Sequence, residues 1–322
     1  MKKRILRVLA AGLLILWCGA FLRTENTEKS QVRALLLEPP GEGSGWTVGL
    51  LYQYPEAAAD AADAAAEVQL CTGTGESLPQ ALQKAEKALP RLAGYRLCET
   101  VLFGPGSGLK QMQDACTELQ KEPVRGLSAK ILQMDFTCAE LQQGEENLPE
   151  QLLEEIEKAD SAAPYLYQNR KAVLLPMIQL SEDGPETAEQ GLLLTPQENL
   201  LLSAEETRMA RLLLEQGGET TFELDGKPVI SRHCVVSVEA EREGFRVTLT
   251  GQRKAGTEQV TQSQQEQLET LCVRTLQDCW AAGCDLLSLR AVRMLQQGSG
   301  ENALTTENAC PQLQADVRFL EF

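Results

Sequence analysis

The sequence predicts an α+β protein of three small mixed α/β domains behind an N-terminal export or anchor segment. Its 322 residues exceed the roughly 100–200 residues of a typical single domain. Apolar residues make up 43% of the chain and charged residues 24%, which is typical of folded globular proteins. Short β-rich segments alternate with amphipathic helical segments. We expect an N-terminal α/β domain at 30–145, a small middle domain or linker region at 146–199, and a C-terminal sheet with a long helix at 200–322.

The first 23 residues predict a signal or membrane anchor. Four basic residues precede fifteen apolar ones from Val8 to Leu22, and a basic flank stays in the cytoplasm, so the rest of the chain is expected to be exported. A fifteen-residue helix spans only about 22 Å of a roughly 30 Å hydrocarbon core. A cleaved signal, a short anchor and a lipoprotein signal therefore all stay open. Cys18 is the candidate lipid attachment residue, although Trp17 stands where a lipobox normally has a small residue.

The first domain begins after a polar tether from Arg23 to about Ser30. Two apolar, β-rich runs at Trp46–Tyr54 and Val68–Thr72 predict paired strands. The Ala/Asp tract between them, Glu56–Glu67, predicts a loop or a solvated helical insert.

A helix is predicted after the second strand, because Leu82, Ala85 and Leu89 recur at helical intervals and Ser77 and Gln80 have the spacing of a capping box. A strand at Glu99–Phe103 and a helix near Leu109–Leu119 follow. The turn between them reads GPGSGLK, but it lacks the Gly-Lys-Ser/Thr triplet of a phosphate loop. A plain glycine-rich turn is the favoured interpretation.

The middle region predicts an amphipathic helix at Leu148–Ala159, whose glutamates form the solvated face rather than a catalytic pair. A linker is expected at Ser161–Pro164. Ala172–Leu180 predicts a buried strand broken by Pro176, and the polar, glycine-bounded stretch Gly184–Gln190 predicts a loop.

The C-terminal region has the clearest pattern. Ser203 and Glu206 form a capping box that opens a helix, and Gly217 and Gly218 stop it. Beyond that helix, Asp-Gly and Glu-Gly turns separate three β-rich runs, which predicts an antiparallel meander. The remaining expected segments are strands at Thr220–Leu224, Pro228–Glu239 and Phe245–Thr250, a long helix at Glu258–Ala282, a turn at Gly283–Leu289 and a closing strand at Gln312–Phe322.

Composition narrows the possible functions. The chain carries 46 acidic and 30 basic residues, a net charge of −16, which disfavours nucleic acid as a partner. Its single histidine, His233, lies in the middle predicted strand of the meander and is interpreted as an ordinary strand residue. We find no nucleophile motif and no metal-type cluster in the sequence. The sequence therefore assigns no catalytic, cofactor-binding or metal-binding residue, and predicts no cofactor.

The chain has ten cysteines, which in an exported protein normally argue for disulfides. Their spacing contains no CxxC pair and no repeat. Cys272 and Cys279 lie seven residues apart on the apolar side of the predicted long helix, where a thiol packs as a small apolar group. Buried free thiols are therefore favoured over bridges for most of the set.

Three stretches carry a family resemblance. The first contains Gly75-Glu76-Ser77-Leu78 with Ala81-Leu82 behind it, then Tyr95 and the strand Val101–Gly104. The second is Glu206-Thr207-Arg208 leading into Leu212–Leu214, and the third is Gly283-Cys284-Asp285-Leu286-Leu287. The order of these stretches, together with the export segment, the meander and the terminal strand, resembles that of the Ger(x)C family. The members of this family are the C subunits of bacterial spore germinant receptors.

The resemblance implies a non-enzymatic subunit attached to the outer face of the inner spore membrane. Its implied partners are the membrane and two integral-membrane germinant-receptor subunits, A and B, and nutrients would trigger the assembled receptor. Two other classes stay open from the residues themselves. They are an extracytoplasmic solute-binding module, which needs a large ligand pocket, and an anchored carboxylate-type hydrolase, which needs two carboxyl groups about 5–10 Å apart.

Overall fold

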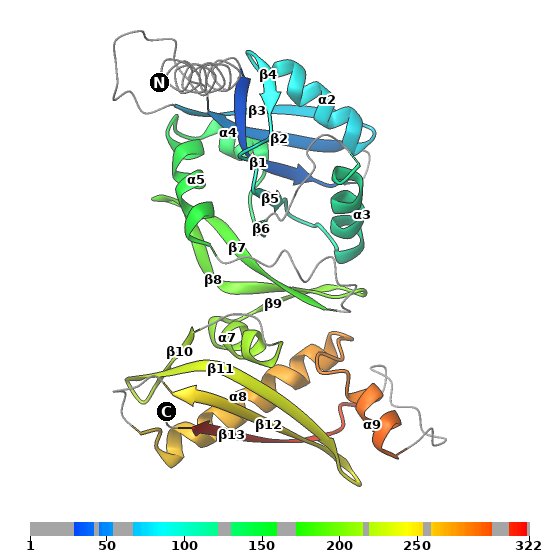
Figure 1. Cartoon of the computed structure of the whole chain (residues 1–322), viewed down its shortest axis with the longest axis vertical. Coiled ribbons are helices and arrows are strands. Elements are labelled where there is room, and N and C mark those ends of the chain that lie inside the picture. The colour runs from blue at the N-terminus through cyan, green and yellow to red at the C-terminus, as the bar shows by residue number, and fades with distance from the viewer. Residues whose placement is uncertain are drawn as a thin grey trace, which may run out of the picture. The chain divides into compact units, whose positions relative to one another are not determined.

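The computed structural model of the chain describes residues 29–41, 45–53, 67–121, 130–159, 172–214, 219–253, 259–297 and 309–320, without the side chains of Arg232, His233, Arg253 and Gln297. Helices and strands alternate through these ranges, which confirms the predicted α+β class (Figure 1). The chain divides into two compact units. Unit 1 contains the described residues up to Ser107, Asp114–Ala159 and Ile178–Glu186, and unit 2 contains Gly108–Gln113, the described part of Asp160–Met177 and Thr187–Phe322. The three domain boundaries predicted from the sequence stay a prediction.

Unit 1 is built on a mixed sheet with strand order β3-β2-β1-β5-β6. Strand β1 is antiparallel to β2 and parallel to β5 and to the short β4, and β5 is parallel to β6. The bounds of these strands are β1 Lys29–Glu38, β2 Trp46–Gln53, β3 Val68–Gly75, β4 Leu92–Gly94, β5 Thr100–Phe103 and β6 Lys130–Met134.

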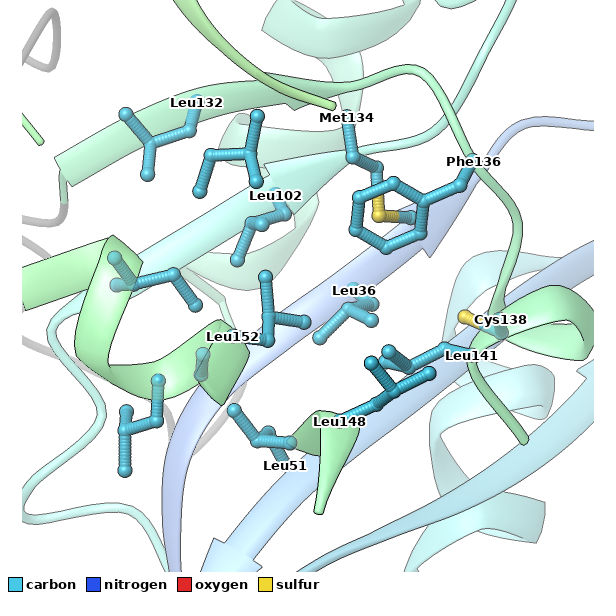
Figure 2. Close-up of a cluster of buried hydrophobic side chains, with 14 of the residues drawn as sticks. Leu36, Leu51, Leu102, Leu132, Met134, Phe136, Cys138, Leu141, Leu148 and Leu152 are labelled. Carbon is cyan, nitrogen blue, oxygen red and sulfur yellow. The ribbon is translucent and has the colours of Figure 1, made fainter. Parts of the chain in front are cut away.

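Helices cover both faces of this sheet. Because side chains alternate along a strand, Val68 and Leu70 of β3 point to one face and Cys71 and Gly73 point to the other. The first face packs against α4 (Cys138–Gln143) and α5 (Leu148–Lys158), whose leucines close over Leu36 of β1 in the cluster of Figure 2. The second face receives α2 (Leu78–Ala88). Helix α3 (Leu109–Leu119), which follows the glycine-rich turn, has residues in both units.

Three further strands, β7 (Val173–Ser181), β8 (Gly184–Leu194) and β9 (Asn199–Leu202), follow α5 along the chain. Strands β8 and β9 form an antiparallel hairpin that pairs Gly191 with Leu202 and Leu194 with Asn199. Both β7 and β8 contribute residues to each unit.

The main body of unit 2 is a four-stranded sheet of order β10-β11-β12-β13 with helices on one face. The first three strands form the predicted antiparallel meander, whereas β13 joins β12 in parallel. Apolar residues of α7 and α8 fill the core over this sheet, with Leu212, Leu268 and Cys272 buried. The elements are α7 Ala204–Leu213, β10 Glu219–Leu224, β11 Lys227–Ala240, β12 Gly244–Arg253, α8 Gln262–Ala281, α9 Leu289–Gln297 and β13 Gln312–Leu320.

Several sequence predictions need correction. The predicted loop at Gly184–Gln190 is wrong, because those residues form most of strand β8. The polar tether was expected to reach Ser30, but β1 begins at Lys29. Helix α9 begins at Leu289, where only a turn was expected. Ser77 lies at the N-cap of α2, but its side chain makes no capping hydrogen bond; the Gln80 side chain instead accepts from the Glu76 backbone N–H at 3.1 Å.

Candidate functional site

The first motif, Gly75-Glu76-Ser77-Leu78, lies where β3 ends and α2 begins. Here the helix lies directly on the strand backbone. A Cβ atom added to Gly73 would lie 2.2 Å from the Ala85 nitrogen, and one added to Gly75 would lie 2.6 Å from the Ala81 nitrogen. Real Cβ atoms do not approach other atoms this closely, so glycine at these two positions is what allows α2 to pack on β3.

Tyr95 joins the end of α2 to the segment between β4 and β5. Its hydroxyl donates a hydrogen bond of 2.7 Å to Glu86 of α2. Burial, and then the hydrogen bond to the Glu86 carboxylate, raise the pKa of the Tyr95 hydroxyl, so the phenol stays protonated at any physiological pH. The role of this motif residue is therefore to hold α2 against its neighbouring segment.

The second motif, Glu206-Thr207-Arg208, ties α7 to three other segments of unit 2. Glu206 completes the capping box with Ser203 and contacts Arg274 of α8 at 3.3 Å. Thr207 accepts a 2.8 Å hydrogen bond from the Gly191 backbone N–H of β8 and donates to the Leu202 carbonyl. Arg208 pairs with Glu189 of β8 at 3.1 Å. Three consecutive residues thus fix the helix to β8, to the end of β9 and to α8.

The third motif connects α8 to α9. Gly283 has φ +77, a left-handed conformation that favours glycine, and the Cys284 N–H donates to the Cys279 carbonyl at 2.8 Å. This is a Schellman-type helix end, and the two cysteines share one apolar cluster. The buried Asp285 carboxylate then accepts hydrogen bonds from the backbone N–H groups of Leu289 and Arg290, which begin α9. The motif therefore ends one helix and caps the next.

The glycine-rich turn between β5 and α3 is closed by its own groups. The Ser107 hydroxyl donates to the Gly104 carbonyl at 2.7 Å, and the Gly108 N–H donates to the Gln111 side chain at 3.0 Å. Gly106 has φ +76. These contacts satisfy the turn internally, as a structural turn does, and agree with the sequence interpretation.

Glu206 and Asp278 are close enough to be considered as a catalytic pair of carboxyl groups. Glu206 is hydrogen-bonded to Asp278 of α8. Partial desolvation of its carboxyl group, and then that hydrogen bond, raise the pKa of Asp278. Burial also acts to raise the pKa of Glu206, but the hydrogen bonds with Ser203 and Asp278 and the charge of Arg274 together lower it. The Glu206 oxygens already accept from the Ser203 backbone, the Ser203 hydroxyl and Arg274. The pair is thus built into the junction between α7 and α8.

The nine cysteines of the described ranges carry free thiols, and seven of them are buried. Burial raises the pKa of Cys71 to about 11 and the pKa of Cys272 and Cys284 to about 12. A thiol that stays protonated is a poor nucleophile, so these groups act as core side chains. Cys18, the predicted lipid attachment residue, lies outside the described residues, as does the side chain of His233.

One small cavity and two open depressions lie in the described part of the chain. A cavity of about 10 Å³ in unit 2 is lined by apolar side chains and by Ser231 and Cys234, and it has room for about one water molecule. Unit 1 has two open surface depressions, one of them beside the first motif at Gly75, Glu76 and Gln80. Within the described ranges no group of three or more His, Cys, Asp and Glu side chains is placed to hold a metal ion. No helix there is long and apolar enough to cross a membrane.

The fold and these junctions describe a mixed α+β protein whose motif residues connect its elements. In overall fold the chain is similar to a solved structure described as the crystal structure of the GerBC protein. The TM-score is 0.45, the sequence identity is 10%, and the match covers 89% of this chain and 96% of that chain. No protein-family model matches the sequence, and no curated protein matches it.

Proposed function

We propose that this chain is a non-enzymatic, membrane-attached subunit of a spore nutrient-germinant receptor. It would act outside the cytoplasm, on the outer face of the inner spore membrane, by contacting integral-membrane A and B subunits. The observation that carries the proposal is the placement of the three sequence motifs at element junctions. Glu206-Thr207-Arg208 fixes α7, and Gly283 to Asp285 link α8 to α9.

Membrane attachment is supported by the sequence before Lys29. Its basic residues followed by the apolar run Val8–Leu22 direct the chain after Arg23 out of the cytoplasm. Attachment then follows either from the apolar helix or from lipid on Cys18. Protease added to intact protoplasts is expected to digest the chain. A fatty-acid label that is lost on Cys18→Ala would assign lipid attachment, and membrane retention without label would assign a helix anchor.

The two other classes have less support. A solute-binding module needs a pocket of roughly 300–1,000 Å³ that encloses its ligand. Within the described ranges, the cavity in unit 2 measures about 10 Å³, and the depressions in unit 1, of about 460 and 530 Å³, are open to solvent and do not enclose a ligand. A carboxylate-type hydrolase needs two acids free to meet a substrate. The Glu206 oxygens are instead engaged by Ser203 and Arg274. Binding through exposed surface is the function that these residues favour.

The test is deletion of the gene in the spore former that carries it. Deletion is expected to abolish germination in response to one class of nutrient, measured as release of dipicolinate from the spores, and the wild-type gene is expected to restore it. His233→Ala is expected to restore it equally, because no chemistry is assigned to that side chain.

Two results would count against the proposal. Normal nutrient germination in a deletion strain that lacks a second receptor operon would overturn the receptor role. Loss of function in a folded His233→Ala protein would instead favour an enzyme.

A further inference from the structure

We propose that one surface of unit 1 binds the headgroups of an anionic phospholipid membrane. This surface, here called the β4 patch, consists of Arg91 just before β4, Leu92 at its start, and Arg96 and Leu97 in the turn that follows it. The inference rests on the membrane attachment in the proposed function, and adds which face of unit 1 meets the lipid.

The β4 patch lies beside the first residues of β1. Strand β4 runs parallel to β1 and pairs Leu92 with Lys29, Ala93 with Ser30 and Gly94 with Gln31 (Figure 1). Lys29 is also the first described residue after the predicted anchor. The patch is therefore located where the chain enters unit 1 from its N-terminal segment.

The length of the intervening chain keeps the patch near the membrane. Six residues, 23–28, separate the apolar run ending at Leu22 from Lys29. The seven Cα-to-Cα steps from Leu22 to Lys29 reach at most about 25 Å even when fully extended. The start of β1, and Leu92 paired with it, must therefore stay within that reach of the membrane surface if Val8–Leu22 is held there.

The apolar part of the patch consists of two leucines. Leu92 is 78% exposed and Leu97 is 44% exposed, and among the described residues of unit 1 these are the large apolar side chains left exposed. They lie five residues apart, on β4 and on the turn after it. Two leucines next to a membrane anchor can insert at the level of the headgroups, as the apolar residues of interfacial segments do.

The charge of this region is opposite to that of the whole chain. Residues 84–99 contain four basic residues, Lys84, Lys87, Arg91 and Arg96, and two acidic ones, Glu86 and Glu99, whereas the chain as a whole carries −16. A local positive excess in an acidic protein matches an anionic lipid surface, where each basic residue strengthens binding about fivefold.

Lipid fits this patch better than a protein partner does. A stable protein interface buries at least about 1,000 Å² in total, more than four side chains supply. A chain already tethered to the membrane needs only weak additional contacts, because its effective concentration at the surface is high. Two exposed leucines and neighbouring arginines supply contacts of that kind.

The test uses the full chain reconstituted into vesicles and measures hydrogen–deuterium exchange of the peptide covering residues 90–98. We expect slower exchange in vesicles of equal parts phosphatidylglycerol and phosphatidylcholine than in vesicles of phosphatidylcholine alone. Arg96→Gln is expected to reduce that difference by up to about fivefold, the change in binding constant that one basic residue contributes. Leu92→Gln is also expected to reduce it. Both side chains are exposed, so both variants are expected to keep the wild-type melting temperature.

The matched control is Leu295→Gln, which changes a leucine of α9 that is 86% exposed and is expected to leave the exchange difference unchanged. Equal exchange of residues 90–98 in both kinds of vesicle, with the protein floating with the vesicles, would overturn the β4 patch and leave the proposed attachment intact. Protection that appears only when the A and B subunits are present would overturn lipid as the ligand in favour of protein. Failure to float with any vesicle would overturn the attachment and the patch together.

Discussion

Glu206 takes part in two kinds of interaction that depend differently on its charge. Its carboxylate caps α7 and pairs with Arg274, and both contacts favour the ionised form. Its hydrogen bond with Asp278 instead brings two acids together, and that contact favours a proton on one of them. The result is a lowered pKa for Glu206 and a raised pKa for Asp278.

The two acids are predicted to have opposite effects on stability. The Glu206 charge stabilises the fold above its unfolded pKa of about 4.5, and this contribution is lost as the pH falls through the lowered folded pKa. The Asp278 charge destabilises the fold at neutral pH, and this cost disappears as the pH falls below about 3.8. Glu206→Gln should therefore lower the free energy of unfolding at pH 7, and Asp278→Asn should raise it.

Urea unfolding of both variants at pH 7 and at pH 3 measures this. The free energy of unfolding of each variant is expected to differ less from that of the wild type at pH 3 than at pH 7. The Asp278 effect is expected to be a fraction of about 1 kcal/mol, because that side chain is largely exposed to solvent. Two variants that shift stability in the same direction, or by equal amounts at both pH values, would contradict the coupling.

At the scale of single elements, helix α2 of unit 1 and helix α7 of unit 2 both have serine at the N-cap, but the two serines cap their helices differently. The Ser203 side chain accepts from the Glu206 N–H at the start of α7, whereas Ser77 makes no side-chain capping bond at the start of α2. Proline at the second position of α2 explains part of this difference, because it removes one N–H that a cap would satisfy.

We predict that Ser203→Ala lowers the free energy of unfolding by about 1 kcal/mol, the usual cost of losing a capping side chain. Ser77→Ala is the matched control, and is expected to change it by less than about 0.5 kcal/mol. Chemical denaturation of both variants gives the comparison. If both substitutions lowered the free energy of unfolding equally, the capping hydrogen bond of Ser203 would add nothing to stability.

The elements that the sequence predicts correctly are those with a strong periodic pattern. The helix Leu148–Lys158, the helix at Leu109–Leu119 and the meander all form close to their predicted bounds. Strand β8 was missed because its first half, GPETAEQ, has the composition of a loop, and its pairing with β9 comes from residues further along the chain. Helix α9 was missed because the residue before it, Ser288, has φ 56 and does not cap it. The cap comes from Asp285, four residues earlier than Leu289.

The motif residues could be found from the sequence, but their partners could not. Thr207 binds β8 at Gly191, and Glu206 contacts Arg274, which lies 68 positions further along the chain. Spacing along one element predicts a capping box, since its two members lie three residues apart. It does not predict which other element will lie against that helix, because the packing of the whole unit decides this.

At the scale of the whole molecule, unit 2 takes residues from before the predicted boundary at 200. Ala172, Leu174 and Leu193 share one core cluster with Ala210, and with Cys279 and Cys284 at the end of α8. Thr207 also depends on β8 for its hydrogen bond. A fragment that starts at 200 would therefore leave part of this core uncovered.

We predict that a fragment of residues 172–322 unfolds cooperatively and is more stable than a fragment of residues 200–322. The difference should be several kcal/mol, since removing large core side chains costs about 2–5 kcal/mol each. Trp280 is buried and is the one tryptophan of either fragment, so its fluorescence during urea unfolding reports the core directly. Equal stability of the two fragments would instead support a domain boundary at 200.

The position of β1 determines how unit 1 responds to mechanical force. This strand is central in the sheet, antiparallel to β2 on one side and parallel to β4 and β5 on the other. Tension reaching Lys29 from the preceding residues pulls along the strand, and the hydrogen bonds to its neighbours lie across that direction. The hydrogen bonds to β2 and those to β4 and β5 are then loaded in shear at the same time, so they must break together and not one after another. In the proposed membrane attachment, a load passed through residues 23–28 would therefore act on a strand that is hydrogen-bonded along both edges.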